Sequence, residues 1–188
     1  MRLALMPHPD AAAPDIRIEA EAERTSDDRL ALRYRVAGAV AELLLPPPAP
    51  PQRAHGLWQH SCFEAFVRPS ADAGYCELNL APSGQWAAYR FSDYRAGMTV
   101  AEEVPPPHIE MLAASERVEL AATVELQRTF GLLAGLAWHV GLSAVIEERS
   151  GRKSYWALTH PPGEPDFHHE HCFALELPPA RSNPSPRT

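Results

Sequence analysis

The sequence predicts an all-β protein with at most one short helix. Apolar and polar residues alternate with a period of two along many short segments, and turns that contain Pro or Gly separate these segments. The chain has 188 residues, of which 45% are apolar, so it can bury a substantial core. We therefore expect one domain over residues 1–178 and a disordered tail over residues 179–188, whose composition is rich in Pro and Ser.

The first part of the chain reads as an opening series of strands. Alternating or apolar runs predict strands at Ile16–Glu23, Arg29–Val36 and Ala39–Leu45. Gly38 breaks the pattern between the second and the third of these strands. The Pro-rich segment Pro46–Gly56 should then form a stiff, exposed connection that leads to Trp58.

The middle of the chain predicts three further strands, at Ser61–Arg68, Tyr75–Ala81 and Gln85–Ser92. The turn residues Pro82–Gly84 join the last two strands into a hairpin. In the expected register, Asn79 lies opposite Trp86, Glu77 opposite Ala88 and Tyr75 opposite Arg90. A slip of one residue would exchange the faces of one strand relative to its partner.

The last part of the chain continues the same pattern. It predicts strands at His108–Ala113, Val118–Leu126, Trp138–Glu147, Ser154–Leu158 and Cys172–Leu177. Between them, Phe130, Leu133 and Ala134 recur at helical spacing and indicate a short helix within Gln127–Ala137.

Polar and aromatic residues are concentrated within Leu57–Met98, where strands that only build a core would not need them. Trp58 follows the Pro-rich connection, so one face of its ring can stay open to a ligand. Trp138 has apolar neighbours and should lie in the core. Glu64 and Glu77 resemble the acid and base of a glycosidase only in residue type, and a polar strand face explains them more simply, so we expect no catalytic residue.

The three cysteines, Cys62, Cys76 and Cys172, form no C-x-x-C pair and are odd in number, so they indicate reduced thiols. Cys76 falls on the core face. Cys62 falls on the polar face with His60, but a nucleophilic thiol would also need an oxyanion donor, and the sequence shows none. The histidine-rich segment His160–Cys172 invites a metal hypothesis, yet its spacing matches no standard zinc pattern, so we expect the rim of a site and no metal.

The net charge of −7 argues against binding to nucleic acid or to an anionic membrane surface, since both require clustered Lys and Arg. The apolar run in residues 1–10 is too short for a secretory signal, and no apolar run is long enough to span a membrane. We expect a cytoplasmic protein.

Three motifs carry a resemblance to a known family: LWQHSCFEAFV from Leu57, YCELNLAPSGQWAAYRFSDYRAGM from Tyr75, and SYWALTHPPGEPDFHHEHCFALEL from Ser154. Together they resemble the bacterial DOMON-like proteins over Ile16–Pro178, and more distantly the family 9 carbohydrate-binding modules. The resemblance implies an immunoglobulin-like or jelly-roll β-sandwich that binds carbohydrate or haem.

In the sugar-binding relatives, a tryptophan followed six residues later by a glutamate enters the site, and a second tryptophan near the last strand closes it. Trp58 and Glu64 match the first pair, and Trp156 is the candidate for the second tryptophan. Asn79 and Arg90 resemble the groups that bond sugar hydroxyls. The complete set of candidate ligand-binding residues is Trp58, Glu64, Glu77, Asn79, Trp86, Arg90 and Trp156.

Two functions follow as hypotheses. The first is a non-catalytic module, without a cofactor, that binds a sugar or a similar polar ring and that either works alone or docks onto an enzyme. The alternative is a haem-binding electron-transfer domain, which needs axial ligands such as Met and His on facing loops. The residues available for that role are Met98, Met111, His60 and His160.

Overall fold

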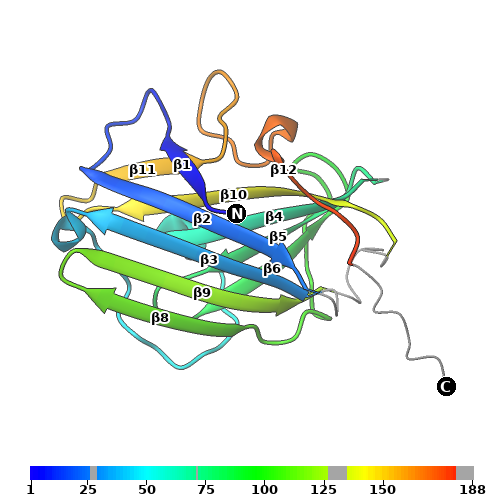
Figure 1. Cartoon of the computed structure of the whole chain (residues 1–188), viewed down its shortest axis with the longest axis horizontal. Coiled ribbons are helices and arrows are strands. Elements are labelled where there is room, and N and C mark those ends of the chain that lie inside the picture. Colours follow the sequence, from blue (N-terminus) through cyan, green and yellow to red (C-terminus); the bar gives the residue numbers. More distant parts are fainter. Residues whose placement is uncertain (26–28, 71, 127–134, 181–188) are drawn as a thin grey trace.

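A computed structural model describes residues 1–25, 29–70, 72–126 and 135–180 and shows an antiparallel β-sandwich (Figure 1). This confirms the predicted fold class. Within these residues the helical segments are three-residue 3-10 turns, and no helix is long and apolar enough to cross a membrane. The helix expected within Gln127–Ala137 falls largely on residues 127–134, which lie outside the described part of the chain, as do residues 181–188 of the expected tail.

Sheet A forms one layer of the sandwich. Its strands, in spatial order, are β1 (Leu3–Pro7), β2 (Ile16–Arg24), β3 (Arg29–Gly38), β9 (Arg117–Glu125) and β8 (His108–Ala114). Apolar residues of β2, β3 and β9 alternate with charged ones, so each strand turns one face to the core and one to solvent.

Sheet B forms the other layer. Its strands, in spatial order, are β7 (Thr99–Val100), β6 (Trp86–Phe91), β5 (Tyr75–Leu80), β4 (Cys62–Pro69), β10 (Trp138–Glu147) and β11 (Lys153–Ala157), and β12 (Leu175–Leu177) pairs with the start of β10. Strand β1 joins the two layers, because Leu3–Leu5 pair with β2 while Met6 and Pro7 pair with β11. The result is one curled sheet folded onto itself.

The main core lies between the two sheets. Phe63 of β4 stacks on Tyr34 of β3 with ring centroids 4.9 Å apart, and the Tyr34 hydroxyl donates a hydrogen bond of 2.7 Å to the Glu64 carbonyl. Trp138 is completely buried beneath the Arg24 guanidinium, as expected for a core residue. Cys76 also lies in this core, which confirms its predicted face.

Two of the expected strands differ in the structure, and two further strands were not expected. Residues 39–45 form a 3-10 turn, η1 (Val40–Glu42), and a single bridge at Leu43, because the chain leaves the sheet at Gly38 with φ of +121°. The last strand starts at Leu175, since Glu170–Cys172 forms the 3-10 turn η3. Strands β1 and β7 were not predicted, because β1, with the sequence LALMP, is apolar at every position and β7 has only two residues, so neither shows alternation.

The expected register of the β5–β6 hairpin is wrong by one residue. Leu80 pairs with Trp86, Asn79 with Ala87, and Glu77 with Tyr89. The connection holds one residue more than expected, because the Ala81 N–H donates to the Gln85 carbonyl and Gly84 takes a positive φ of 88° in the turn. This shift moves Trp86 to the core face of β6.

Replacement of Gly38 by Ala tests the bend at the end of β3. A Cβ atom at this position would lie 2.4 Å from the Asp15 carbonyl oxygen, and the positive φ adds strain for an L residue. We expect Gly38→Ala to lower the free energy of unfolding by about 3 kcal/mol or more in urea denaturation. The control is Gly151→Ala, which also has a positive φ but an open surrounding, and it should cost only about 1 kcal/mol. Equal effects of the two substitutions would contradict a steric role for Gly38.

Candidate functional site

The candidate site lies on the outer face of sheet B, the face that points away from the main core. Its side chains are Cys62, Glu64 and Phe66 of β4, Tyr75, Glu77 and Asn79 of β5, Tyr89 and Phe91 of β6, Ser143 and Val145 of β10, and Tyr155 of β11. Glu64 occupies the middle of this face, because it pairs with Asn79 on one side and with Ser143 on the other. Polar groups therefore lie at the centre, with aromatic rings around them.

Two segments cover part of this outer face. They are residues 92–98, which follow β6, and residues 158–174, which follow β11 and are drawn in orange in Figure 1. Phe167 and Phe173 of the second segment join the rings of the sheet in an apolar cluster separate from the main core. The segment passes so close to β10 that a Cβ on Gly141 would lie 2.9 Å from the Cys172 carbonyl oxygen. The outer face is thus a second, smaller core.

Asp166 links the two covering segments. Its carboxylate accepts hydrogen bonds from the Tyr94 hydroxyl at 2.6 Å, from Arg95 Nη2 at 2.8 Å and from the His168 backbone N–H at 3.1 Å. Burial raises the pKa of Asp166, but the bonds from Tyr94 and Arg95 outweigh it and lower that pKa below its ordinary value. Arg95 takes a positive φ of 50°, which is rare for a residue with a side chain.

A cavity of about 550 Å³ opens between the outer face and the covering segments. It is lined by Trp58, Gln59, Glu64, Glu77, Tyr89, Phe91, Arg95, Met98, Val145, Lys153, Tyr155, Pro165, Phe167 and His168. The volume falls in the range of small-molecule sites, about 300–1,000 Å³.

Two carboxyl groups form the floor of the cavity. Glu64 is only 3% exposed and Glu77 only 6%. Asn79 donates a hydrogen bond of 2.7 Å to Glu77 Oε1, whereas Glu64 Oε1 has no hydrogen-bond partner among the described residues. Burial and the neighbouring Glu77 raise the pKa of Glu64 well above its ordinary value, and burial also raises the pKa of Glu77. The hydrogen bond from Asn79 and the charge of Arg95 act in the opposite direction on the pKa of Glu77, and burial outweighs them.

His168 stands beside this floor as a neutral ring. Its Nδ1 atom hydrogen-bonds the Tyr75 hydroxyl at 2.7 Å, and its Nε2 atom lies 3.8 Å from Glu77 Oε2. Burial and the charge of Arg95 lower the pKa of His168 to about 4, so the imidazole carries no charge at neutral pH. His168 can therefore exchange hydrogen bonds with a ligand but does not neutralise Glu77.

Aromatic rings form the rim. Trp58 lies in the 3-10 turn η2 (Leu57–Gln59), which begins after Gly56 in the left-handed conformation. Its ring is 39% exposed and meets Tyr89 edge to face, with centroids 5.8 Å apart. His55 Nδ1 hydrogen-bonds the Tyr89 hydroxyl at 3.0 Å and so orients this second ring. Tyr155 closes the rim from β11.

The structure brings some of the predicted site residues together. Trp58, Glu64 and Glu77 line the cavity, and Asn79 lies beneath it, bound to Glu77. Their role in binding a ligand stays a prediction.

Three predicted residues lie elsewhere. Trp86 and Trp156 are in the main core, each 3% exposed, and Arg90 pairs with Glu103 from the same side of β6 as Trp86. The one-residue shift in the register of β6 explains why Trp86 and Arg90 lie on the face opposite to the cavity. Trp156 points inward because its neighbour Tyr155 takes the outward position on β11.

Sequence reasoning missed several residues of the cavity. They are Tyr89 and Phe91 of β6, Tyr155 of β11, and Arg95 of the first covering segment, whereas Phe167 and His168 belong to the segment His160–Cys172 that was expected to form a rim. With the correct register, alternation along β6 would have indicated Tyr89 and Phe91. Arg95 reaches the site only through contacts between distant parts of the chain, so the sequence carried no local signal for it.

The residues proposed as haem ligands do not gather at one place. Met98 lines the cavity, whereas Met111 belongs to β8 in the other sheet. His60 hydrogen-bonds Glu147, and His160 hydrogen-bonds the Met6 carbonyl. Among the described residues, no group of three or more His, Cys, Asp or Glu side chains is placed to hold a metal ion.

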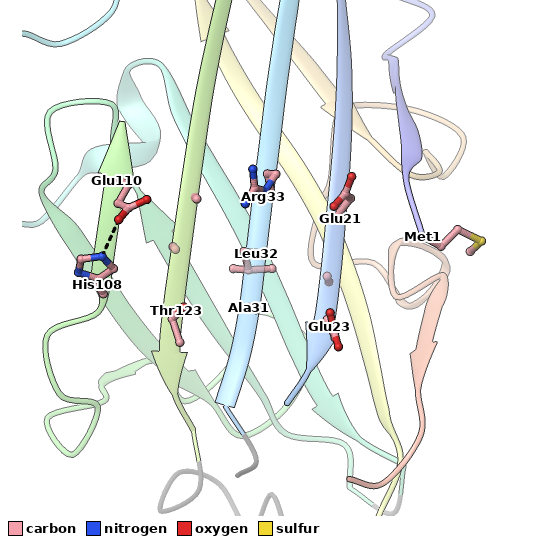
Figure 2. Close-up of a pocket in the computed structure, with 12 residues that line it drawn as sticks. Met1, Glu21, Glu23, Ala31, Leu32, Arg33, His108, Glu110 and Thr123 are labelled. Carbon is pink, nitrogen blue, oxygen red and sulfur yellow. Dashed lines mark hydrogen bonds and ion pairs between the residues drawn. The ribbon is translucent and has the colours of Figure 1, made fainter. Parts of the chain in front are cut away.

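Figure 2 shows a second hollow, of about 320 Å³, on the outer face of sheet A. Among its charged side chains, Glu21, Arg33 and Glu110 have partners within the described residues. Arg33 pairs with Glu119, and Glu21 accepts from Arg35 at 2.6 Å and from Arg2 at 3.2 Å. No buried polar atom without a partner lines this hollow in the described part of the chain, so it makes a weaker candidate than the cavity on sheet B.

Comparison with known proteins gives structural neighbours only. No family model and no curated protein matches the sequence. An inferred carbohydrate-binding protein from Bacteroides uniformis matches with a TM-score of 0.60 and 16% identity, over 95% of this chain and 85% of that one. A family 9 carbohydrate-binding module from Caldicellulosiruptor kristjanssonii, in complex with cellotriose, matches with a TM-score of 0.59 and 13% identity, over 98% and 86%. A family 9 module from the same organism, in complex with glucose, matches with a TM-score of 0.56 and 13% identity, over 97% of this chain and 88% of that one. At these identities the likeness establishes the fold, a β-sandwich like that of these modules.

Replacement of Glu64 by Gln tests the buried carboxyl pair. A carboxyl group whose pKa is raised on folding contributes stability below its unfolded pKa of about 4.5 and loses it as the pH rises through the folded value. We therefore expect Glu64→Gln to raise the free energy of unfolding at pH 8 by about 1–3 kcal/mol in urea denaturation. This free energy should also depend less on pH than it does in the natural protein. Glu110→Gln, at an exposed position on β8, is the control and should change neither property. A Glu64→Gln protein that is less stable at pH 8 would contradict the buried-charge argument.

Proposed function

We propose that this protein is a non-catalytic carbohydrate-binding module that holds a sugar ring in the cavity on sheet B. The observation that carries the proposal is the division of the cavity into an aromatic rim and a polar floor. Trp58 and Tyr155 present ring surface, while Glu64 and Glu77 present oxygen atoms. Sugars have apolar C–H faces and a belt of hydroxyl groups, so both kinds of surface are needed to bind them.

The arrangement favours binding over catalysis. Glu64 and Glu77 rise from adjacent strands of one floor, so both would meet the same side of a ligand. Hydrolysis of a glycosidic bond uses two carboxyl groups that flank the bond. Gln59, Lys153 and His168 add polar groups at other positions around the cavity and can fix the orientation of the hydroxyls.

The fold adds support of a general kind. Two of its structural neighbours are modules solved with glucose and with cellotriose. The resemblance of the sequence motifs to DOMON-like proteins fits the same fold and stays part of the proposal. We do not extend the proposal to haem, since no arrangement of the described Met and His residues favours it.

Replacement of Trp58 by Ala tests the function. Titration calorimetry against a panel of mono- and oligosaccharides should identify a ligand of the natural protein. Trp58→Ala should weaken the affinity for that ligand by about tenfold or more, because the aromatic ring that stacks on the sugar is removed. The melting temperature should change little, since the Trp58 ring is 39% exposed.

Trp138→Ala is the matched control. It removes a fully buried ring and should lower the free energy of unfolding by about 3–5 kcal/mol. If Trp58→Ala destabilised the fold to the same extent, or left saccharide binding intact, the cavity would lose its role as the binding site.

A further inference from the structure

We propose that the ligand of the sheet B cavity carries an ammonium group, as an amino sugar does, and that Glu64 and Glu77 receive this group. The proposal rests on the proposed function and specifies its ligand class. It follows from three features of the cavity: a buried carboxyl oxygen without a hydrogen-bond donor among the described residues, basic residues that do not bond to it, and walls of aromatic rings.

The first feature is that a buried carboxyl oxygen of the floor has no hydrogen-bond donor among the described residues. Glu64 is 97% buried, and its Oε1 atom has no hydrogen-bond donor within the described chain. Asp166, the acid that links the two covering segments, differs sharply, because it receives three side-chain hydrogen bonds from Tyr94 and Arg95. A buried carboxylate without a partner is costly, and a native site retains one chiefly where a ligand completes it.

The second feature is that none of the basic residues lining the cavity donates to the Glu64 Oε1 atom. Arg95 directs two of its N–H groups to Asp166. His168 is neutral, as argued above, and its Nδ1 atom is bound to Tyr75. Lys153 lines the cavity from β11 without donating to Glu64 Oε1. Positive charge for this atom is therefore left for the ligand to supply.

The third feature is the composition of the walls. Five aromatic residues line the cavity: Trp58, Tyr89, Phe91, Tyr155 and Phe167. The faces of aromatic rings are electron-rich and attract cations, most strongly where water is excluded. An aromatic enclosure above two carboxyl groups suits a cation better than it suits a neutral hydroxyl.

A neutral sugar and an amino sugar would thus meet the floor differently. A neutral sugar can donate hydroxyl hydrogens, but at least one carboxyl of the pair would then keep its proton, since two adjacent buried negative charges repel. An ammonium group brings three donors and a positive charge, so it can bond to both carboxylates. The floor should therefore discriminate between ligands by charge.

Titration calorimetry with three probes of one size class tests the inference: D-glucosamine, N-acetyl-D-glucosamine and D-glucose, at pH 6 and low salt. Glucosamine is protonated there, whereas acetylation removes the charge and glucose lacks the nitrogen. We expect glucosamine to bind about tenfold or more tightly than either of the others.

Variants connect the preference to the floor. Glu64→Gln and Glu77→Gln should each reduce the preference for glucosamine over glucose to about threefold or less, whereas Glu110→Gln should keep it in full. Melting temperatures of the variants would show that each is folded. Glucose binding as tightly as glucosamine would overturn the inference and leave the carbohydrate-binding function standing. Absence of glucosamine binding would also overturn it, and the wider function would then be judged separately on the saccharide panel.

Discussion

The candidate site depends on the link that Asp166 makes between two segments of the chain far apart in sequence. Its bonds to Tyr94 and Arg95 hold residues 158–174 against residues 92–98, over the outer face of sheet B. Beneath this cover, Tyr75 and Phe91 stack with centroids 4.8 Å apart, and Phe66 packs against Phe173. Without the cover these rings would face water, and the cavity would be an open sheet surface. This partly exposed ion pair thus helps to convert a strand face into an enclosed site.

The same cover explains the electrostatics of the floor. Glu64 and Glu77 lie on an outward face, where carboxylates are normally solvated, but the covering segments exclude most of the water from them. Burial then opposes ionisation, and the free energy of folding carries this penalty in the absence of a ligand. Binding sites commonly sacrifice stability in this way, because polar groups arranged for a ligand are unsatisfied without it. The Glu64 Oε1 atom, which has no hydrogen-bond partner among the described residues, is therefore better understood as a feature of binding than of folding.

Local patterns predicted the strands and most of their faces, because alternation requires only neighbouring residues. Glu64 and Glu77 were placed on one outer face by this argument, and Trp58 was identified from its position after a Pro-rich connection. Trp86 was misplaced because a turn with one additional residue reverses the faces of everything that follows it. Arg95 and Asp166 are 71 residues apart, and no local pattern records that such residues meet. The strands of the site were thus predictable, and a rim was expected at His160–Cys172, whereas the contacts that fix the cover were not predictable.

The two sheets nevertheless differ in a way that the sequence does record. Along β2 and β3, buried residues alternate with exposed ones, and the outward charges pair across strands, as Arg35 and Glu21 do. Along β4 and β5 nearly every residue is buried on both faces. A strand that carries apolar residues on both of its faces must be covered on both sides. A carboxyl group in such a strand, as in Cys62–Val67 with Glu64 at its centre, must then be buried as well. Such a residue requires a partner, and where the chain provides none, the ligand is the natural source of one.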